Sequence, residues 1–132
     1  MSDQPPPGTE PTIRTIPMPA NTNAAGDIFG GWLMAQMDIA AGLVSAREAR
    51  GRTSTVAVDA MQFHRPVKVG DEVSLYARLL SVGRSSMRIE VRAWRRDRHT
   101  EHSEQVTSAI FTFVALDEDG RPRPVDLALR TP

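Results

Sequence analysis

The most apolar stretch of the chain, residues 28–44, consists of hydrophobic and small side chains with a single charged residue, Asp38. Its apolar side chains recur at helical spacing, at Leu33, Met37, Ala40, Ala41 and Val44. The pattern predicts a buried helix from about Gly30 to about Arg50, ended by Gly51. Asp38 is then an acid on a helix suited to burial. Such a charge must be paired or used chemically, because burying an isolated carboxylate is costly.

After Gly51 the pattern changes to β-branched and alternating segments, which are typical of strands. Together with a short segment before the helix, the predicted strands cover residues 12–18, 53–66, 72–83, 85–96 and 103–116. The last four follow one another through short turns, which favours antiparallel pairing. The order predicts an α+β fold, with an antiparallel sheet of about five strands around one long helix. Residues 110–116 are apolar on both faces, so a second subunit is expected to cover the sheet.

The length of 132 residues fits one domain. Residues 1–11, rich in proline and polar groups, predict a disordered lead-in, residues 12–123 the folded domain and residues 124–132 a peripheral tail. The N-terminus has neither the basic nor the apolar region of a secretory signal, so a cytoplasmic location is expected. The interrupted apolar run from Ile28 is too short for a membrane span.

Charge and cysteine content exclude several function classes. Sixteen basic residues balance sixteen acidic ones, so no overall field attracts nucleic acid or a membrane surface. The absence of cysteine excludes disulfides, thiolate catalysis and thiolate metal sites. Fifteen of the basic residues are arginine and one is Lys68. This bias suits planar contacts with phosphate or carboxylate, but an arginine-rich genome would produce it equally well.

Gly30 and Gly31 stand where the predicted helix begins. Unpaired backbone N–H groups and the positive end of the helix dipole suit a developing oxyanion there. The alternative is that the two glycines simply start the helix against the sheet. Asp38 suits a general base that activates water, or a nucleophile that attacks an acyl carbon. Its alternative is a buried acid bonded to an arginine or a backbone amide.

The spacing of these residues predicts assembly. Eight residues separate Gly30 from Asp38, which is roughly 12 Å along a helix, whereas oxyanion donors must lie within about 3 Å of the oxygen. One substrate carbonyl cannot easily touch both residues of one chain. Two antiparallel helices from different subunits would bring the Gly30 end of one beside Asp38 of the other. The spacing therefore predicts a dimer with a shared site.

Four segments, in this order along the chain, resemble a known family. They are MPANTNAAGDIFGGWLMAQMD at 18–38, FHRPVKVGD at 63–71, VGRSSMRIEVRAW at 82–94 and FTFVALDEDGRPR at 111–123. They resemble the acyl-CoA thioesterases of the hot dog fold, within them the small bacterial type exemplified by YciA. The resemblance implies that fold, hydrolysis of acyl-CoA to free acid and coenzyme A, sites shared between subunits, and a trimer of dimers. It implies no cofactor, since coenzyme A is part of the substrate and product.

The resemblance also implies binding residues. It places Asn23 near the thioester, as a candidate for positioning water or the carbonyl, although Asn23 and Asp27 are equally suited to turn formation or helix capping. It implies coenzyme A contacts at Arg84, Ser85 and Ser86, where a cation, backbone amides and hydroxyls suit phosphate groups.

Further basic residues are weaker candidates. Arg65 and Lys68 are candidates to extend a phosphate-binding funnel. From Arg88 to Arg92 the charged residues alternate with apolar ones, which predicts one solvated face and one buried face of a strand.

The histidines do not predict a metal site. His99 and His102 lie in a charged hairpin without apolar surroundings or a third ligand, so a surface loop is expected. His64 departs from the residue usual in this family. It also lacks the HFPG-like surroundings of the hot dog dehydratases, so dehydration is disfavoured.

The predicted function is metal-independent hydrolysis of acyl-CoA, with Asp38 activating water and the amides at Gly30 or Gly31 stabilising the oxyanion. A non-catalytic acyl-CoA sensor of the same fold is the alternative. Nucleic-acid binding through the arginine-rich strand lacks both an aromatic platform and net positive charge.

Overall fold

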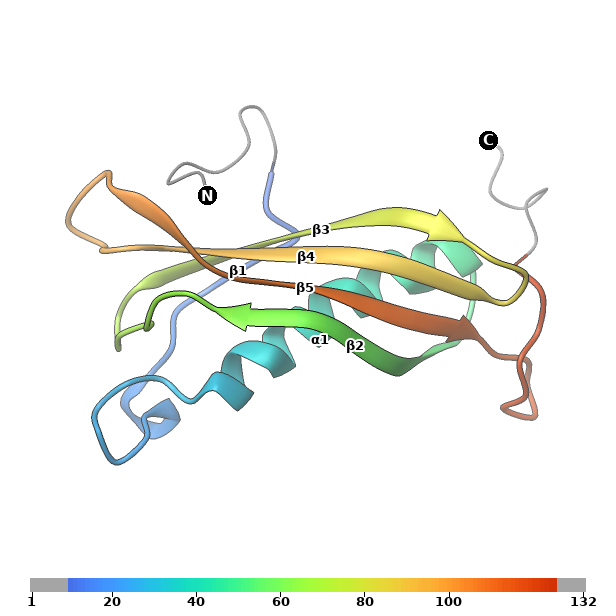
Figure 1. The fold of residues 1–132 in the computed structure, drawn as a ribbon, viewed down its shortest axis with the longest axis horizontal. Coiled ribbons are helices and arrows are strands. Elements are labelled where there is room, and N and C mark those ends of the chain that lie inside the picture. Colours follow the sequence, from blue (N-terminus) through green and yellow to red (C-terminus); the bar gives the residue numbers. More distant parts are fainter. Residues whose placement is uncertain (1–9, 126–132) are drawn as a thin grey trace.

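The computed structural model describes residues 10–125, in which one long helix crosses one sheet (Figure 1). The elements in chain order are β1 (Ile13–Thr15), the 3-10 helix η1 (Pro19–Asn21), α1 (Gly30–Ala49), β2 (Thr53–Phe63), β3 (Glu72–Val82), β4 (Ser86–Arg96) and β5 (Ser103–Ala115). This confirms the predicted α+β class. The predicted lead-in at 1–11 and tail at 124–132 lie almost wholly outside the described residues. Within residues 10–125, no helix combines the length and hydropathy needed to cross a membrane.

α1 lies where it was predicted, but a different residue ends it. Most of the predicted apolar stripe is buried against the sheet, at Leu33, Met37, Ala40 and Ala41. The helix ends at Ala49, and the next residue, Arg50, takes the left-handed conformation with φ 52°. The prediction that Gly51 ends the helix is wrong by one residue. The chain reverses direction directly after the last helical residue. Arg50 therefore takes the left-handed conformation that was expected of Gly51.

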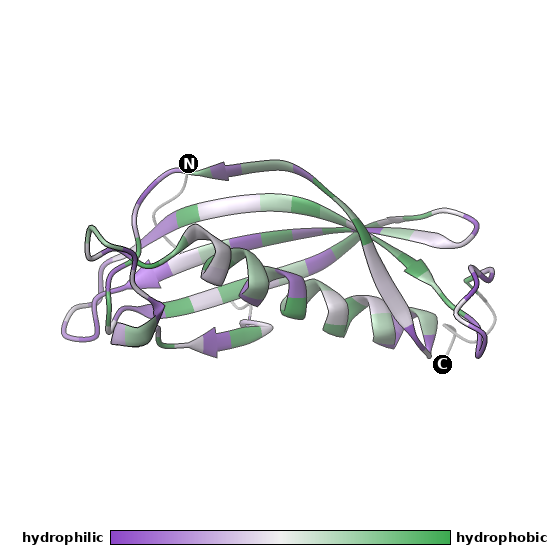
Figure 2. Ribbon diagram, turned by 90° about the horizontal axis from the view of Figure 1, so that it is seen from below, coloured by the Kyte–Doolittle hydropathy of each residue, from purple (hydrophilic) through white to green (hydrophobic). Residues whose placement is uncertain are grey.

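The sheet has the order β1-β3-β4-β5-β2, and every neighbouring pair is antiparallel. α1 covers one face of this sheet (Figure 2). The apolar residues of β4 that face α1 are fully buried, at Met87, Ile89, Val91 and Ala93. β1 is shorter than predicted, ending at Thr15. Pro17 follows it closely and has no N–H for a ladder hydrogen bond.

The face of the sheet away from α1 carries polar and aromatic side chains. Tyr76 and Trp94 meet edge-to-face, with ring centroids 5.4 Å apart, and the Arg92 guanidinium lies 5.3 Å from the Trp94 ring. Glu90 accepts a hydrogen bond from Arg78 at 2.9 Å and lies 3.5 Å from Arg92. Several charged residues of this face are therefore paired with one another, whereas Tyr76 and Trp94 on the same face are buried, so only part of it is solvated.

β2 departs from strict alternation at two points. The pairs with β5 on either side of these points are Thr55 with Phe113 and Ala57 with Thr112, then Asp59 with Ile110 and Gln62 with Ser108. At each point β2 contains one more residue than β5, which is a β-bulge. Each extra residue turns the following side chains to the other face of the sheet. The side chains of Thr55, Val58 and Phe63 consequently all face α1 despite their uneven spacing.

Candidate active site

Asp38 lies in the middle of α1 and faces β2. The Thr55 hydroxyl donates a hydrogen bond of 2.6 Å to Asp38 Oδ1. Asp38 is half-buried rather than buried, which corrects the expectation from the sequence. It lies at the side of the helix next to β2, an edge strand of the sheet, where no further strand covers it within residues 10–125. Asp38 thus combines a fixed carboxylate oxygen with access to solvent.

A cavity of about 280 Å³ opens beside this carboxylate. Four of its lining residues lie on one side of α1, at Gly31, Met34, Ala35 and Asp38. Their spacing of three, four and seven residues places them on the same helix face. Thr55, Val58 and the fully buried Phe111 form the opposite wall. The cavity is mostly apolar, with a carboxylate and a hydroxyl on its wall.

The start of α1 leaves backbone donors free. Its N-cap residue is Phe29, whose side chain makes no capping hydrogen bond. Within residues 10–125, the N–H groups of Gly30 and Gly31 have no acceptor, whereas those of Trp32 and Leu33 both point to the Phe29 carbonyl. Free N–H groups at a helix N-terminus are suited to an oxyanion. The two predicted glycines therefore offer the donors that the sequence suggested.

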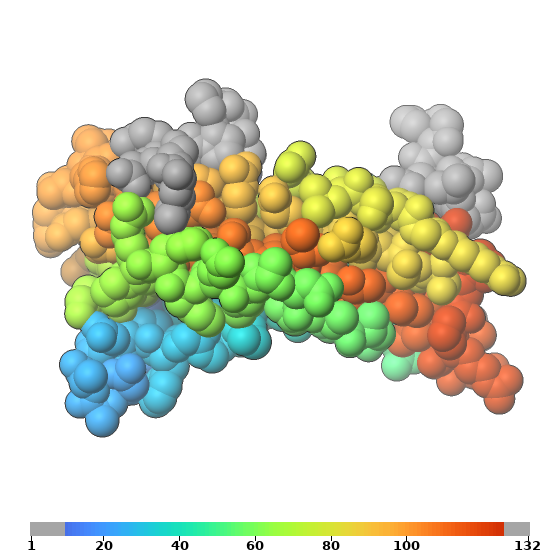
Figure 3. All heavy atoms as spheres, viewed as in Figure 1, coloured from blue at the N-terminus to red at the C-terminus, as the bar shows by residue number. Residues whose placement is uncertain are grey.

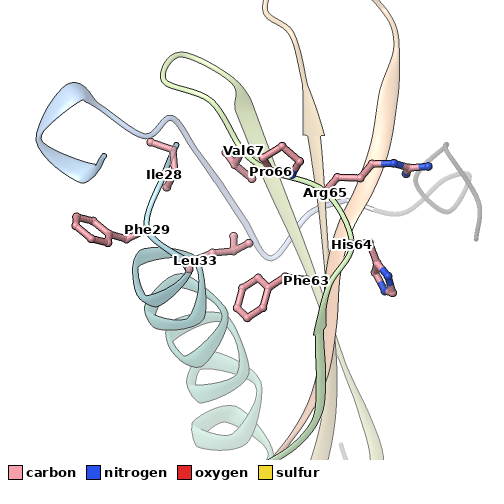
Figure 4. A pocket seen from close by; sticks show the side chains of 9 residues that line it. Ile28, Phe29, Leu33, Phe63, His64, Arg65, Pro66 and Val67 are labelled. Atoms are coloured by element: carbon pink, nitrogen blue, oxygen red, sulfur yellow. The ribbon is translucent and has the colours of Figure 1, made fainter. Parts of the chain in front are cut away.

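A second cavity, of about 310 Å³, lies at the start of α1 between the helix and the end of β2. Apolar residues dominate its lining, including Ile28, Phe29, Leu33, Phe63 and Val67. Figure 4 shows the Phe63 ring directed toward the start of the helix, while the side chains of His64 and Arg65 point the other way. Gly30 lines this cavity, and Gly31 lines the one beside Asp38.

The loop before α1 is held by Asn23. Its side-chain oxygen accepts hydrogen bonds from the backbone N–H groups of Ala25, at 2.9 Å, and Asp27, at 3.1 Å. These contacts fit the turn-forming alternative for Asn23, and its side chain makes no other hydrogen bond with residues 10–125. Asp27 does not cap α1, because its carboxylate pairs with Lys68 Nζ.

The same loop packs against the segment that follows β2. The Ile28 N–H donates to the Val67 carbonyl at 3.0 Å. In the space-filling view the loop lies directly beside that segment, blue against green (Figure 3). The pair between Asp27 and Lys68 lies at the same junction. These contacts fix the start of α1 relative to the end of β2.

Arg84, Ser85 and Ser86 lie in the turn between β3 and β4 and at the start of β4. This turn and the start of α1 lie toward opposite ends of the molecule (Figure 1). Backbone carbonyls of the turn are occupied within the chain, that of Ser85 by the Ala115 N–H and that of Arg84 by the Val125 N–H, each at 2.8 Å. The Arg84 side chain is exposed. One chain therefore does not bring these residues to the glycines of α1.

The basic residues predicted to extend a phosphate funnel are paired with acids. Lys68 contacts Asp27, and Arg65 Nε lies 3.4 Å from Glu104. The same acid binds Arg95, which also contacts Asp71 at 3.2 Å. Burial alone would lower the pKa of the Arg95 guanidinium, but Glu104 and Asp71 outweigh it and raise that pKa. This cluster joins the segment after β2 to the ends of β3, β4 and β5.

The histidines lie at the surface. His64, His99 and His102 are exposed, and His102 Nε2 is 3.8 Å from Glu104. Among the described residues, no three acids or histidines are grouped closely enough to hold a metal ion.

Sequence reasoning missed Thr55, although it placed this residue on a strand. Nothing in the local sequence marks it, since Thr53 and Thr55 are similar hydroxyl residues on the same strand. Thr53 lies near Ser45, with 2.7 Å between their hydroxyl oxygens, and only Thr55 reaches Asp38. The distinction comes from how α1 crosses β2.

Comparison with known proteins places the chain in a family. The model of the thioesterase superfamily matches residues 25–102. An uncharacterized acyl-CoA thioester hydrolase of Zymomonas mobilis is 62% identical over 88% of this chain and 78% of its own length. The acyl-CoA thioester hydrolase YciA of Salmonella typhimurium is 48% identical, over 90% of this chain and 92% of its own. The crystal structure of the hexameric thioesterase y2039 from Yersinia pestis matches with a TM-score of 0.85 at 47% identity, covering 91% of this chain and 98% of that one. The chain therefore belongs to the thioesterase superfamily and has its hot dog fold, as the sequence motifs indicated.

Proposed function

We propose that this protein hydrolyses acyl-CoA thioesters to a carboxylic acid and coenzyme A. The observation that carries the proposal is the Asp38 carboxylate, held by Thr55 at 2.6 Å on the wall of a mostly apolar cavity. The relatives named as acyl-CoA thioester hydrolases support the same substrate class.

Asp38 is the proposed base. Thr55 occupies Oδ1, so Oδ2 is the oxygen available to accept a proton from water. That water oxygen forms a bond to the thioester carbonyl carbon as its proton passes to Asp38. The carbon–sulfur bond then breaks, and coenzyme A leaves as the thiolate and takes up a proton. Direct attack by Asp38 on the thioester, followed by hydrolysis of the anhydride, is the second route open to the same carboxylate.

The free N–H groups at Gly30 and Gly31 are the proposed oxyanion donors. They carry no charge of their own, but they are fixed by the helix before the substrate arrives. Donors that need no reorganisation during the reaction stabilise the tetrahedral intermediate most effectively. Asn23, in the loop that precedes them, is a candidate for positioning the attacking water or the carbonyl. Its Oδ1 holds the loop, which leaves the amide nitrogen for the substrate.

The site is proposed to be shared between two subunits. Asp38 shares its cavity with Gly31 of the same chain, whereas Gly30 lines the other cavity, at the start of α1. Apolar side chains are exposed on α1 and on β2, at Met34, Ile39, Leu43, Val56 and Val58. β2 is also an edge strand, and among residues 10–125 no further strand pairs with its outer side. A second copy that covers this surface would bury it and bring its own Gly30 toward Asp38.

Coenzyme A is proposed to bind at Arg84, Ser85 and Ser86 of a neighbouring chain. These residues lie toward the other end of the molecule from Gly30, so a nucleotide bound there serves a site that includes another subunit. The hexameric state of the Yersinia pestis relative supports an assembly large enough to supply that chain, and we propose a trimer of dimers.

Replacing Asp38 by Asn tests the proposal. Loss of the base should lower kcat by about 10²- to 10⁴-fold, measured as thiol release from butyryl-CoA, while binding of coenzyme A remains. Asp59→Asn is the matched control, because Asp59 is exposed on β2 and pairs with Ile110 on the face away from α1. Near-normal kcat in Asp38→Asn would overturn the assigned base. Saturable acyl-CoA binding by the unmodified protein without thiol release would favour the sensor instead.

A further inference from the structure

The second bulge of β2 decides where Phe63 points. Between Asp59 and Gln62, β2 contains Ala60 and Met61 where β5 contains only Ala109. Without the extra residue, Phe63 would be five alternating positions from Val58 and would face away from α1. With it, both side chains face the helix.

Ala60 forms this bulge in an unfavourable backbone conformation. Its φ is 53°, in the left-handed region that residues with a Cβ rarely adopt. Strained backbone in an otherwise regular strand persists only where the surrounding structure holds it, and it is found preferentially at functional sites. The consequence of the strain here is the direction of Phe63.

The Phe63 ring lies against Gly30. A Cβ built on Gly30 would be 3.4 Å from Cζ and 3.5 Å from Cε1 of that ring. Phe63 is 51% exposed, so the hydrophobic core does not account for its position. Its ring instead forms a wall of the apolar cavity at the start of α1. The ring and Gly30 line the same cavity, so a substrate carbonyl held by the Gly30 N–H would lie close to the ring.

We propose that Phe63 is a specificity-determining residue that selects acyl groups unbranched next to the thioester carbonyl. The inference rests on the proposed hydrolysis with Gly30 as an oxyanion donor. At the α-carbon, a straight acyl chain carries two hydrogen atoms and the next chain carbon, and such a chain fits along the ring. A methyl branch at that carbon meets the ring, which Ala60 and the bulge hold in place.

Two isomeric substrates test the inference. Butyryl-CoA and isobutyryl-CoA have the same number of carbon atoms. The ratio of their kcat/KM values therefore measures the effect of the branch and not that of acyl-group size. We expect the unmodified protein to prefer butyryl-CoA by about tenfold or more, since one misplaced methyl group is worth roughly this discrimination. Phe63→Ala should bring the ratio close to one. Gln62→Ala is the matched control, because Gln62 pairs with Ser108 on the opposite face of the sheet and should leave the ratio unchanged.

A second pair of variants tests the role of the bulge. Glycine readily adopts a positive φ, so Ala60→Gly should keep the preference for butyryl-CoA. The β-branched side chain of valine disfavours a positive φ, so Ala60→Val should lower the kcat/KM ratio of butyryl-CoA to isobutyryl-CoA, as Phe63→Ala does. Phe63→Leu, which retains an apolar side chain for folding, should give an intermediate ratio. The inference would be overturned if active Phe63→Ala and Phe63→Leu kept the kcat/KM ratio of the unmodified protein. It would also be overturned if the unmodified protein hydrolysed both thioesters equally well. Either result would leave the proposed hydrolysis itself unaffected. Absence of thiol release from every acyl-CoA would instead overturn the proposed function, and this inference with it.

Discussion

At the scale of single residues, the hydrogen bond from Thr55 to Asp38 is the contact that most sharply separates a functional from a structural acid. Thr55→Val keeps the shape of the side chain and removes the donor. A hydrogen bond to a charged group contributes about 1.5–3 kcal/mol, so kcat should fall by about 10- to 100-fold if the bond positions the base in the transition state. Thr53→Val is the control, because the Thr53 hydroxyl meets Ser45 instead. An unchanged kcat in Thr55→Val would show that Asp38 needs no such positioning.

Gly31 allows the chemical and structural roles of a glycine to be separated. Among the described residues, a Cβ at Gly31 has no atom within 4 Å apart from its chain neighbours and the local helix backbone, so Gly31→Ala fits the fold. Alanine is the better helix former, so the free energy of unfolding should stay equal or rise by up to about 1 kcal/mol. Activity should nonetheless fall, because the methyl group enters the cavity beside Asp38. Urea unfolding and thiol release, measured on the same sample, check both outcomes. Full activity would mean that Gly31 only starts the helix.

At the scale of elements, the end of α1 contains a strained residue that lies away from the proposed chemistry. Arg50 has φ 52° and is exposed. Arg50→Gly should raise the free energy of unfolding by about 1 kcal/mol, since glycine adopts this conformation without the Cβ clash. Arg47→Gly, inside the last turn, should lower it by a similar amount. Thermal unfolding of both variants checks the prediction, and equal melting temperatures would contradict it. Neither change should alter kcat.

At the scale of the whole molecule, a shared site predicts complementation. Asp38→Asn removes the base from one subunit, and Gly30→Val blocks the donor end of the other. A mixed dimer retains one intact site, with Asp38 and Gly30 from different chains. Each variant alone should be almost inactive, while unfolding and refolding an equal mixture should recover about a quarter of the unmodified activity, as random pairing in a symmetric dimer requires.

The control for this experiment is mixing without refolding, which should recover nothing if the subunits do not exchange. Failure of the refolded mixture to regain activity, with both variants folded and associated, would mean that each chain holds a complete site. Light scattering on the unmodified protein provides the second check, and six chain masses are expected for a trimer of dimers.

The secondary-structure elements and the fold class could be predicted from the amino-acid pattern alone. The 3.6-residue spacing from Leu33 to Val44 and the alternation from Met87 to Ala93 record which faces must be buried, and burial of apolar surface is the main force in folding. The same pattern indicated the glycines at the start of α1 and the single acid on it. The family motifs then indicated the hot dog fold, which the comparisons confirm.

The contacts of those residues depend on how the elements pack against one another. Thr53 and Thr55 are the same residue type on the same strand. Because of the way α1 crosses β2, the Thr55 hydroxyl donates to Asp38 and the Thr53 hydroxyl lies beside that of Ser45. Phe63 faces Gly30 because of a bulge that depends on pairing with β5, a strand more than forty residues away. Local periodicity indicates which side chains are buried. It does not indicate which residues of two strands pair, because the pairing register is set by partners distant in the chain. The elements could therefore be predicted from the sequence, while the walls of the two cavities depended on how the elements meet.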